Sequence, residues 1–465
     1  MDPITASSKA QAPPRHHDEE PHPKNTRTII LRGLALCLIA AFILSNIQTP
    51  VSYYHGRLKR RSFAQESVDQ RARRILSENP LIDGHIDFAV VLREVYGNQI
   101  DNAQWSQRFQ NGTLSGHVDL ARLRKGLSGG AFWSVFAPCP AKGQDFSDEN
   151  LAASVQYTMD QIDATDRAYG AYPNDFALNI DHSGALNAFK HGKLISPLGV
   201  EGLHQIGNSV SNLRLFHRLG ARYVTLTHNC HNIYADAACL ENPFRKAEPH
   251  WHGVSPLGRQ LIHEMNRIGM IVDLSHVSEF TSCWLGSEET MTDILGGRSD
   301  WPGSRAPIIF SHSSAWAICP HPRNVKDHVL QRVKQHNSVV MVNISPDFIA
   351  CVDKGNQNGI PEPDPEHADL DQVVRHIMYI GNLIGYDHVG LGTDFDGIPA
   401  GPRGFEDVSK YPDLVIALLN AGVDDSDVAK IVGRNVLRVW KDVDSVSAQM
   451  KAEDAPVMED NRKPT

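Results

Sequence analysis

The sequence predicts an α/β protein, a (β/α)8 barrel of the TIM type, on two observations. Eight short runs rich in β-branched and large apolar residues recur along the chain, and most of them end in a histidine or a carboxylate. Segments with helical periodicity separate these runs, for example 209–219 and 257–268. Such runs are typical of buried parallel strands, and strands that alternate with helices form parallel sheets. We therefore expect one barrel whose functional residues lie at the carboxyl ends of its strands.

The polar residues at the ends of these runs indicate a site. Two of the later runs each break off at a histidine, His276 and His312. One histidine after an apolar run is most often a core or loop residue, but two in succession are a stronger signal. Because side chains alternate along a strand, His85 and Asp87 in the first run point to the same side. The expected strands are 81–87, 131–136, 195–201, 221–228, 269–276, 306–314, 338–343 and 388–394.

The length of 465 residues suits one such barrel with insertions and tails. The apolar fraction of 41% and the charged fraction of 21% are those of an ordinary globular protein. A formal net charge of −9 argues against nucleic acid as the main partner. The expected parts are a disordered polar tail (1–27), a transmembrane signal-anchor (28–47), a stalk (48–71), the barrel (72–444) and a polar C-terminal tail (445–465).

The membrane prediction depends on residues 28–47, which are apolar apart from Arg32 and a few small polar residues. About 20 such residues cross a bilayer, and the segment has no polar face that would fit a buried amphipathic helix. An uncleaved anchor is favoured over a signal peptide, because the preceding region is long and no small-residue cleavage site follows. Basic residues on the two sides are nearly balanced, so charge does not set the orientation.

Cysteines and sequons bear on the compartment. Cys37 lies in the hydrophobic segment, and no CxxC pair is present, so a zinc ribbon is not expected. An even number of cysteines in the body is compatible with disulfides, although the same number would be unremarkable in the cytosol. The sequon at Asn111, in a polar loop, favours glycosylation outside the cytosol, whereas the one at Asn343 ends an expected inner strand and is attributed to chance. The body cysteines are Cys139, Cys230, Cys239, Cys283, Cys319 and Cys351.

Five residues at strand ends have the chemistry of a metal site: His85, Asp87, Glu201, His276 and His312. Three imidazoles and two carboxylates suit zinc, and a carboxylate that can bridge suits two ions. Two ions about 3.5–4 Å apart share a water, lower its pKa and polarise the bond that it attacks. Such a site hydrolyses amides, esters or phosphoesters, and the spacing alone does not choose between these substrates.

Seven motifs resemble, in the same order, those of the membrane (renal) dipeptidase family, zinc-dependent peptidases of the amidohydrolase type. The resemblance runs from about Ala72 to Val443 and so covers nearly the whole body. Each motif is modest by itself, but seven in order are very specific. The motifs are Asp83–Asp87, Gly199–Gly202, Thr225–Asn229, Asp273–Ser278, Phe310–Ser314, Arg323–Val325 and Gly392–Gly397.

The resemblance implies a zinc-dependent dipeptidase with two zinc ions in each chain. His85 and Asp87 would hold one ion and His276 and His312 the other, while Glu201 and a water or hydroxide would bridge them. The hydroxide would attack the peptide bond of a dipeptide that has a free C-terminal carboxylate. A D-residue at that end of the substrate is also within the family's range.

Three further residues acquire roles from the resemblance. His228 would stabilise the tetrahedral oxyanion, and Arg323 would bind the free carboxylate as a planar bidentate donor. Asp394 would take a proton from the bridging water and pass it to the leaving amine, so that it also contacts substrate. Without the resemblance, Arg323 reads equally well as a solvated loop charge and Asp394 as a turn residue.

The resemblance also implies two disulfides and an orientation. The implied pairs are Cys139 with Cys230 and Cys319 with Cys351, while Cys239 and Cys283 stay unassigned. Disulfides favour a body outside the cytoplasm, and hence a single-pass type II anchor that holds the protein to a membrane through residues 28–47. Members of the family often form homodimers, so a homodimer is an assembly that the resemblance allows.

The sequence departs from the family's pattern at three places. Phe348 stands where the mammalian members have a tyrosine near the substrate, which removes a hydroxyl contact. The expected anchor is N-terminal, whereas the mammalian members carry a C-terminal lipid anchor. An insertion at 355–366, rich in proline and aspartate, is placed to reshape the mouth of the site.

Two other functions compete with the dipeptidase. A related binuclear amidohydrolase acting on a non-peptide amide, lactone or phosphoester would need no carboxylate clamp, so Arg323→Ala should spare its activity. A membrane-tethered binding protein that has lost catalysis is the second alternative. The complete set of metal ligands together with Asp394 argues against it, because clustered carboxylates and imidazoles are costly to keep without a function.

Overall fold

The computed structural model describes residues 66–279 and 290–460. Within those ranges no helix is long and apolar enough to cross a membrane. The predicted polar tail, the anchor at 28–47 and most of the stalk lie outside the described residues, so those predictions stay predictions. From Ser67 onward the chain forms one structural unit.

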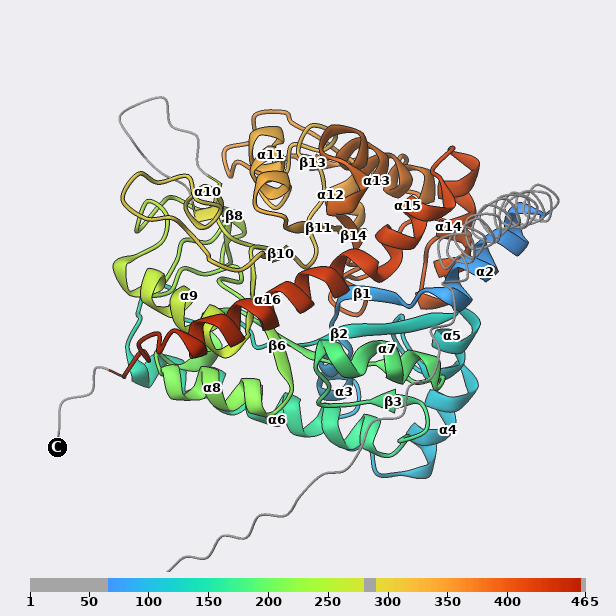
Figure 1. The fold of residues 1–465 in the computed structure, drawn as a ribbon, viewed down its shortest axis with the longest axis horizontal. Coiled ribbons are helices and arrows are strands. Elements are labelled where there is room, and N and C mark those ends of the chain that lie inside the picture. The colour runs from blue at the N-terminus through green and yellow to red at the C-terminus, as the bar shows by residue number, and fades with distance from the viewer. Residues whose placement is uncertain (1–65, 280–289, 461–465) are drawn as a thin grey trace, which may run out of the picture. The chain divides into compact units, whose positions relative to one another are not determined.

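The centre of this unit is a curled sheet of ten strands, all paired in parallel (Figure 1). Each of the eight predicted runs overlaps one of its strands, so the strand predictions are confirmed. Two short strands, β4 (Leu194–Ile195) and β3 (Phe176–Ala177), extend the sheet beside β2. The others, in spatial order, are β14 (Val389–Leu391), β11 (Val339–Val342), β10 (Ile309–Phe310), β9 (Ile271–Asp273), β6 (Ala221–Thr225), β5 (Leu198–Glu201), β2 (Ser128–Val135) and β1 (Leu81–Ile86).

Backbone hydrogen bonds join the two ends of this strand order. The Asp394 N–H donates to the His85 carbonyl at 3.0 Å, and the Asp87 N–H donates to the Phe395 carbonyl at 2.8 Å. The segment that follows β14 therefore lies alongside β1 as a parallel neighbour. The fold is an α/β fold with a curled parallel sheet, consistent with the predicted TIM-type barrel.

Helices cover the outside of the sheet, as the apolar strands require. The expected helices at 209–219 and 257–268 form as α8 (Val210–Arg218) and α9 (Pro256–Ile268). The Ser255 hydroxyl accepts the Gly258 N–H at the start of α9, and Gly269 ends the helix in the left-handed conformation that glycine favours. The other long helices are α2 (Val68–Glu78), α6 (Asp148–Gly170), α7 (His182–Lys190), α11 (Asp327–Gln335), α13 (Leu370–Ile384), α14 (Tyr411–Asn420) and α16 (Asn435–Ala452).

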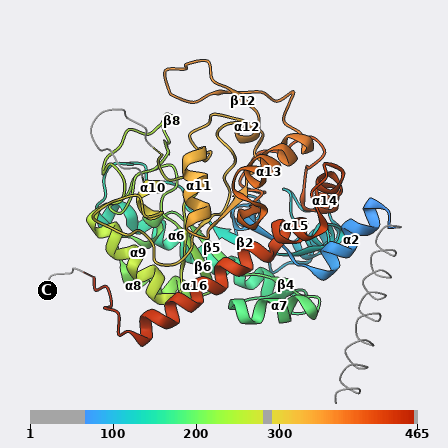
Figure 2. The same ribbon diagram turned by 45° about the horizontal axis from the view of Figure 1, so that its top comes forward.

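Shorter elements lie in the loops. The hairpins are β7 (Cys239–Leu240) with β8 (Arg245–Lys246) and β12 (Cys351–Val352) with β13 (Glu362–Pro363). The β12–β13 hairpin contains the predicted insertion and stands beyond α12 and α13 in Figure 2. The remaining helices are α3 (Phe88–Glu94), α4 (Ala103–Asn111), α5 (Leu120–Lys125), α10 (Thr290–Ile294), α12 (Pro346–Ile349) and α15 (Asp425–Ala429), with helical turns at Leu203–Ile206, Tyr386–His388, Val408–Lys410 and Lys430–Arg434.

Helix α16 differs from the expectation of a polar tail from residue 445. It continues to Ala452, because Ser447 and Met450 on its inner face are buried. Trp440 of the same helix packs on Phe132, in a cluster of side chains that come from near the starts of several strands. In Figure 1 this red helix runs along the sheet. The starts of the strands are thus covered, and their carboxyl ends are left for the site.

Both predicted disulfides form. Cys139–Cys230 joins the loop after β2 to the loop after β6, and Cys319–Cys351 joins the loop after β10 to β12. Cys239, in β7, is buried and forms no disulfide with another described cysteine. Cys283 lies outside the described residues.

Candidate functional site

The five predicted metal ligands converge in two groups that share Glu201. In the first group, the His85 Nε2 atom lies 3.0 Å from Asp87 Oδ2 and 3.6 Å from Glu201 Oε1. The three side chains come from the carboxyl ends of β1 and β5, and all are buried. This is the arrangement in which one carboxylate can serve two ions.

The second group places both remaining histidines on the same oxygen of Glu201. His276 Nε2 lies 3.0 Å and His312 Nε2 3.5 Å from Glu201 Oε1, and the two Nε2 atoms are 3.0 Å apart. Burial, reinforced by nearby positive groups, lowers the pKa of His276 and of His312 well below the ordinary value. Both rings are therefore neutral, the form in which imidazole binds a metal ion.

The Nδ1 atoms of the three histidines have partners outside the ligand groups, so their Nε2 atoms are the ones that face the position of a metal. His85 Nδ1 lies 2.7 Å from the Tyr223 hydroxyl, and His276 Nδ1 lies 3.1 Å from Asn229 Oδ1. His312 Nδ1 lies 2.7 Å from the Ser311 hydroxyl. Contacts of this kind fix the tautomer and orientation of a histidine ligand.

A metal also fits the unsatisfied groups of the site. Asp87 Oδ1 is buried and has no hydrogen-bond partner within the described chain. A buried carboxylate oxygen without a partner is costly. A cation held by the five donors would remove that cost, and the mixture of imidazole and carboxylate donors suits zinc.

Two buried aspartates, Asp83 and Asp273, hold the ligand-bearing strand ends in register. Asp83 accepts the Thr393 N–H at 2.8 Å and the Thr393 hydroxyl at 2.7 Å, which ties β1 to the residue before Asp394. Asp273 accepts the Ser311 N–H at 2.7 Å and the Ser311 hydroxyl at 2.6 Å, which ties β9 to the residue before His312. Each aspartate thus fixes a functional side chain on a neighbouring strand.

Asp394 lies beside the first group. Its Oδ1 is 4.0 Å from His85 Nε2, and its Oδ2 accepts a hydrogen bond from Asn343 Nδ2 at 3.0 Å. Burial raises the pKa of Asp394 to about 7, and the carboxylates of Asp87 and Glu201 act in the same direction. A carboxyl with a pKa near neutrality can both accept and donate a proton.

Arg323 lines the same cavity, which has a volume of about 310 Å³. The side chain is buried, its Nε has no partner among the described residues, and its Nη2 lies 3.4 Å from the His312 carbonyl. The guanidinium carbon lies 5.1 Å from the centre of the Phe348 ring. A buried guanidinium with unused donors is a binding site for an anion such as a carboxylate.

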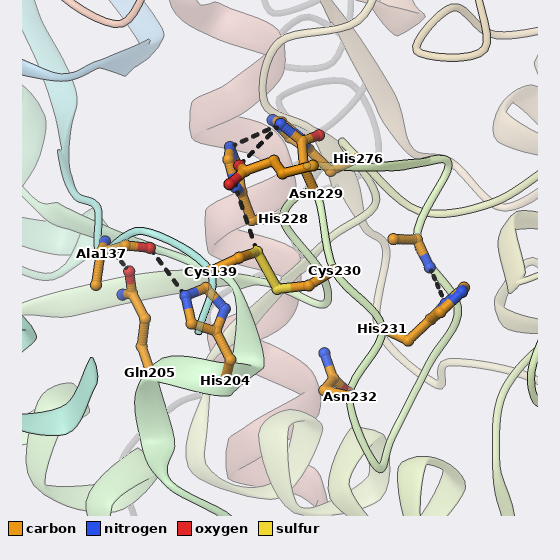
Figure 3. Close-up of a disulfide and its surroundings, with 12 residues drawn as sticks. Ala137, Cys139, His204, Gln205, His228, Asn229, Cys230, His231, Asn232 and His276 are labelled. Carbon is orange, nitrogen blue, oxygen red and sulfur yellow. Dashed lines mark hydrogen bonds and ion pairs between the residues drawn. A yellow bond between two sulfur atoms is a disulfide. The ribbon is translucent and has the colours of Figure 1, made fainter. Parts of the chain in front are cut away.

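His228 lies between the first disulfide and the metal ligands (Figure 3). Its Nδ1 is 3.2 Å from Glu241 Oε1 and 3.8 Å from Cys139 Sγ. Its ring centre lies 4.5 Å from that of His276 and 4.8 Å from that of Phe136, which it meets edge to face. His228 lines the cavity together with Arg323 and Asp394.

The structure thus brings together every residue predicted for the site, and it adds some that the sequence analysis missed. Tyr223 could have been found, because it stands two residues before Thr225 in the same strand, and both side chains therefore point to the same side of the sheet. Asn343 was treated as a chance sequon, although it is buried against Asp394. Glu241 carries no signal in the sequence, since a hairpin brings it to the site. The predicted glycosylation site, Asn111, is exposed at the end of α4, and its modification is untested.

A cluster of buried imidazoles and carboxylates at the carboxyl ends of a curled parallel sheet is typical of a metallohydrolase. The sequence model of the membrane dipeptidase family, peptidase family M19, matches residues 69–454. The chain therefore belongs to the membrane dipeptidase family, and it is a hydrolase of the dipeptidase type. The predicted membership is confirmed.

Individual relatives agree with this assignment. The chain is 45% identical over 379 residues to the dipeptidase tcpJ of Claviceps purpurea, which covers 81% of this chain and 80% of the relative. It is 39% identical over 459 residues to the dipeptidase aclJ of Aspergillus oryzae, covering 97% and 96% of the two chains. The match therefore extends over most of the length of both relatives.

Solved structures share the fold at low identity. The probable dipeptidase PvdM from Pseudomonas aeruginosa superimposes with a TM-score of 0.68 at 22% identity, over 82% of this chain and 99% of that one. A metallopeptidase from Rhodobacter sphaeroides, solved with a phosphinate mimic of the dipeptide L-Ala-D-Ala, gives a TM-score of 0.64 at 23% identity, over 78% and 99%. These likenesses support the α/β fold.

Proposed function

We propose that this protein is a zinc-dependent dipeptidase that hydrolyses dipeptides with a free C-terminal carboxylate. One observation carries the proposal: a buried guanidinium with an unused Nε, Arg323, lines the same cavity as the bridging ligand Glu201. An esterase or phosphoesterase has no need for a second anion site at that place. The cavity of about 310 Å³ is at the small end of ligand pockets and suits two residues better than a longer peptide.

Two zinc ions would be held by the two groups of ligands. His85 and Asp87 would hold one ion and His276 and His312 the other, with Glu201 shared. When bound, the ions would lower the pKa of a coordinated water and polarise the peptide carbonyl. The partners of the Nδ1 atoms support this assignment, since they leave each Nε2 free to bind.

The remaining residues bind and orient the dipeptide. Arg323 pairs with the terminal carboxylate through two N–H donors, and this fixes which peptide bond reaches Glu201. Asp394, which lies beside His85 and accepts a hydrogen bond from Asn343, takes the proton from the attacking water and delivers it to the leaving amine. His228 stabilises the negative charge that develops on the carbonyl oxygen.

The test is hydrolysis of a dipeptide panel that includes Cys-Gly and Gly-D-Ala, with zinc counted by elemental analysis. Arg323→Ala should raise KM far more than it lowers kcat, and Asp394→Asn should abolish turnover with zinc retained. Arg218→Ala serves as the control, because Arg218 is an exposed arginine at the end of α8. Zinc without peptide cleavage would favour a non-peptide substrate, and a zinc-free protein would favour a binding role.

We also propose a closed eight-stranded barrel, a type II membrane anchor at residues 28–47 and a homodimer. The backbone bonds between β1 and the segment after β14 support closure. The disulfides support a body in an oxidising compartment, since such bonds are rare in the cytosol. Protection of the body from protease in sealed vesicles would test the orientation, and sedimentation of the purified body would test the dimer.

A further inference from the structure

The ring of His228 needs a means of orientation, and the Glu241 carboxylate lies where it can provide one. Glu241 Oε1 is 3.2 Å from His228 Nδ1, in a contact where the His228 side chain is 11% exposed and the Glu241 side chain 29%. Burial opposes ionisation of Glu241, but the hydrogen bonds from His228 and Asn229 and the charges of nearby histidines together outweigh it and lower the pKa of the carboxyl. The contact is thus a hydrogen bond to a carboxylate, which is stronger than one between neutral groups.

The hairpin of β7 and β8 fixes the position of this carboxylate. The Glu241 N–H donates to the Asn229 carbonyl at 3.1 Å, directly after His228 in the chain. At the base of the hairpin, the Ala238 N–H donates to the His276 carbonyl at 2.7 Å. The hairpin is therefore attached to the backbone beside both histidines and holds Glu241 at a set distance from the site.

Glu241 also contacts the partner of a predicted metal ligand. The Asn229 side-chain amide lies 3.4 Å from Glu241 Oε1, while its Oδ1 accepts from His276 Nδ1 at 3.1 Å. Figure 3 shows Asn229 and His276 next to the His228 ring. The Glu241 carboxylate thus contacts two groups: His228, which would contact the substrate, and Asn229, which orients the predicted metal ligand His276.

We propose that Glu241 is a positioning residue, which holds the His228 ring at the angle needed to meet the oxyanion of the substrate. A carboxylate on Nδ1 fixes the rotation of an imidazole, the arrangement known from Ser-His-Asp hydrolases. The other nitrogen, Nε2, lies 3.4 Å from the Asn229 side-chain amide, a contact that it would exchange for the substrate oxyanion by donating its own N–H. The proposal rests on the dipeptidase function proposed above. It adds a residue from the loop between β6 and α9, on the face where this fold carries its site.

The experiment compares Glu241→Ala with Glu241→Gln, whose side-chain oxygen can still accept the His228 Nδ1–H. Arg245→Ala, in the opposite strand of the same hairpin, is the matched control. For Gly-D-Ala, Glu241→Ala should lower kcat by about tenfold or more with KM nearly unchanged, which is the usual size for an orienting partner. Glu241→Gln should recover most of that loss, and Arg245→Ala should match the wild type.

Four further readouts separate positioning from a structural role. Zinc content and melting temperature should be unchanged in Glu241→Ala, while its affinity for a phosphinate analogue of the dipeptide, measured by calorimetry, should fall with kcat. In a His228→Ala background, Glu241→Ala should cost nothing more, because residues that act through one another are not additive.

Several results would overturn the inference. A kcat of Glu241→Ala within twofold of the wild type would do so, as would an equal loss in Glu241→Gln accompanied by lost zinc or a lower melting temperature. A full additional loss in the His228→Ala background would place the action of Glu241 elsewhere. A wild type that is inert on dipeptides would instead overturn the proposed function, and this inference with it.

Discussion

Tyr223→Phe is the sharpest test of the proposed metal site, because it removes one hydroxyl and keeps the ring. The Tyr223 hydroxyl lies 2.7 Å from His85 Nδ1, and both side chains are fully buried. The Tyr223 ring packs on Phe132 and against the backbone of Gly199, and phenylalanine retains these contacts. The substitution therefore isolates the hydrogen bond to a metal ligand.

The size of the effect follows from that burial. With zinc on Nε2, His85 carries its proton on Nδ1 and donates it to the tyrosine oxygen, and phenylalanine leaves this donor unsatisfied. A buried unsatisfied donor costs about 1–3 kcal/mol. Loss of an orienting partner lowers metal affinity by about 10–100-fold, which corresponds to about 1.4–2.7 kcal/mol. The two estimates agree, so we expect a zinc affinity at least about tenfold weaker.

A competition titration against a chromogenic chelator measures this affinity directly and needs no substrate. Tyr169→Phe is the matched control, because the Tyr169 hydroxyl is equally buried but has no hydrogen-bond partner in the described part of the chain. It should leave zinc affinity unchanged. A Tyr223→Phe variant that binds zinc within twofold of the wild type would refute the assignment of His85 as a ligand held by Tyr223.

Three other substitutions have defined outcomes. Gly397→Ala would place a Cβ 2.2 Å from Asp87 Oδ2, so zinc content and kcat should both fall while far-UV circular dichroism is unchanged. Replacing Cys139 and Cys230 by serine should lower the free energy of unfolding in urea by about 2–4 kcal/mol, because the bond closes a loop of 91 residues. Glu264→Gln, which removes the charge paired with two arginines, should cost about 3 kcal/mol at pH 7. Because contacts with these arginines lower the pKa of Glu264 against the effect of burial, the wild type should lose this advantage as pH falls through that pKa.

The sequence predicted the strands and the ligands well, because both depend on local pattern. A buried parallel strand reads as a short apolar run, and a residue just after it lies at the end where this fold places its site. His276, His312 and Glu201 were found in that way. The α16 boundary was predicted too early, since the buried Ser447 and Met450 are spaced among polar residues that resemble a tail.

The residues that orient the ligands were missed, because their role depends on contacts between distant segments. Asn343 ends a strand, like the ligands, but only its contact with Asp394 reveals its role. Glu241 reaches His228 through a hairpin whose path depends on backbone bonds to Asn229. A sequence therefore predicts the catalytic and metal-binding side chains far better than it predicts the residues that orient them.

Asp83 and Asp273 show how the fold prepares the site before any ion binds. Both are fully buried, and each accepts an N–H and a hydroxyl from the residue that precedes a functional side chain on a neighbouring strand. Four strands of the sheet are thus joined by side chains at the level of the ligands, in addition to their backbone pairing. Because these bonds are made entirely within the protein, the fold itself holds these strand ends in register. We therefore expect metal binding to order less of the chain here than in small zinc domains that fold only around their ion.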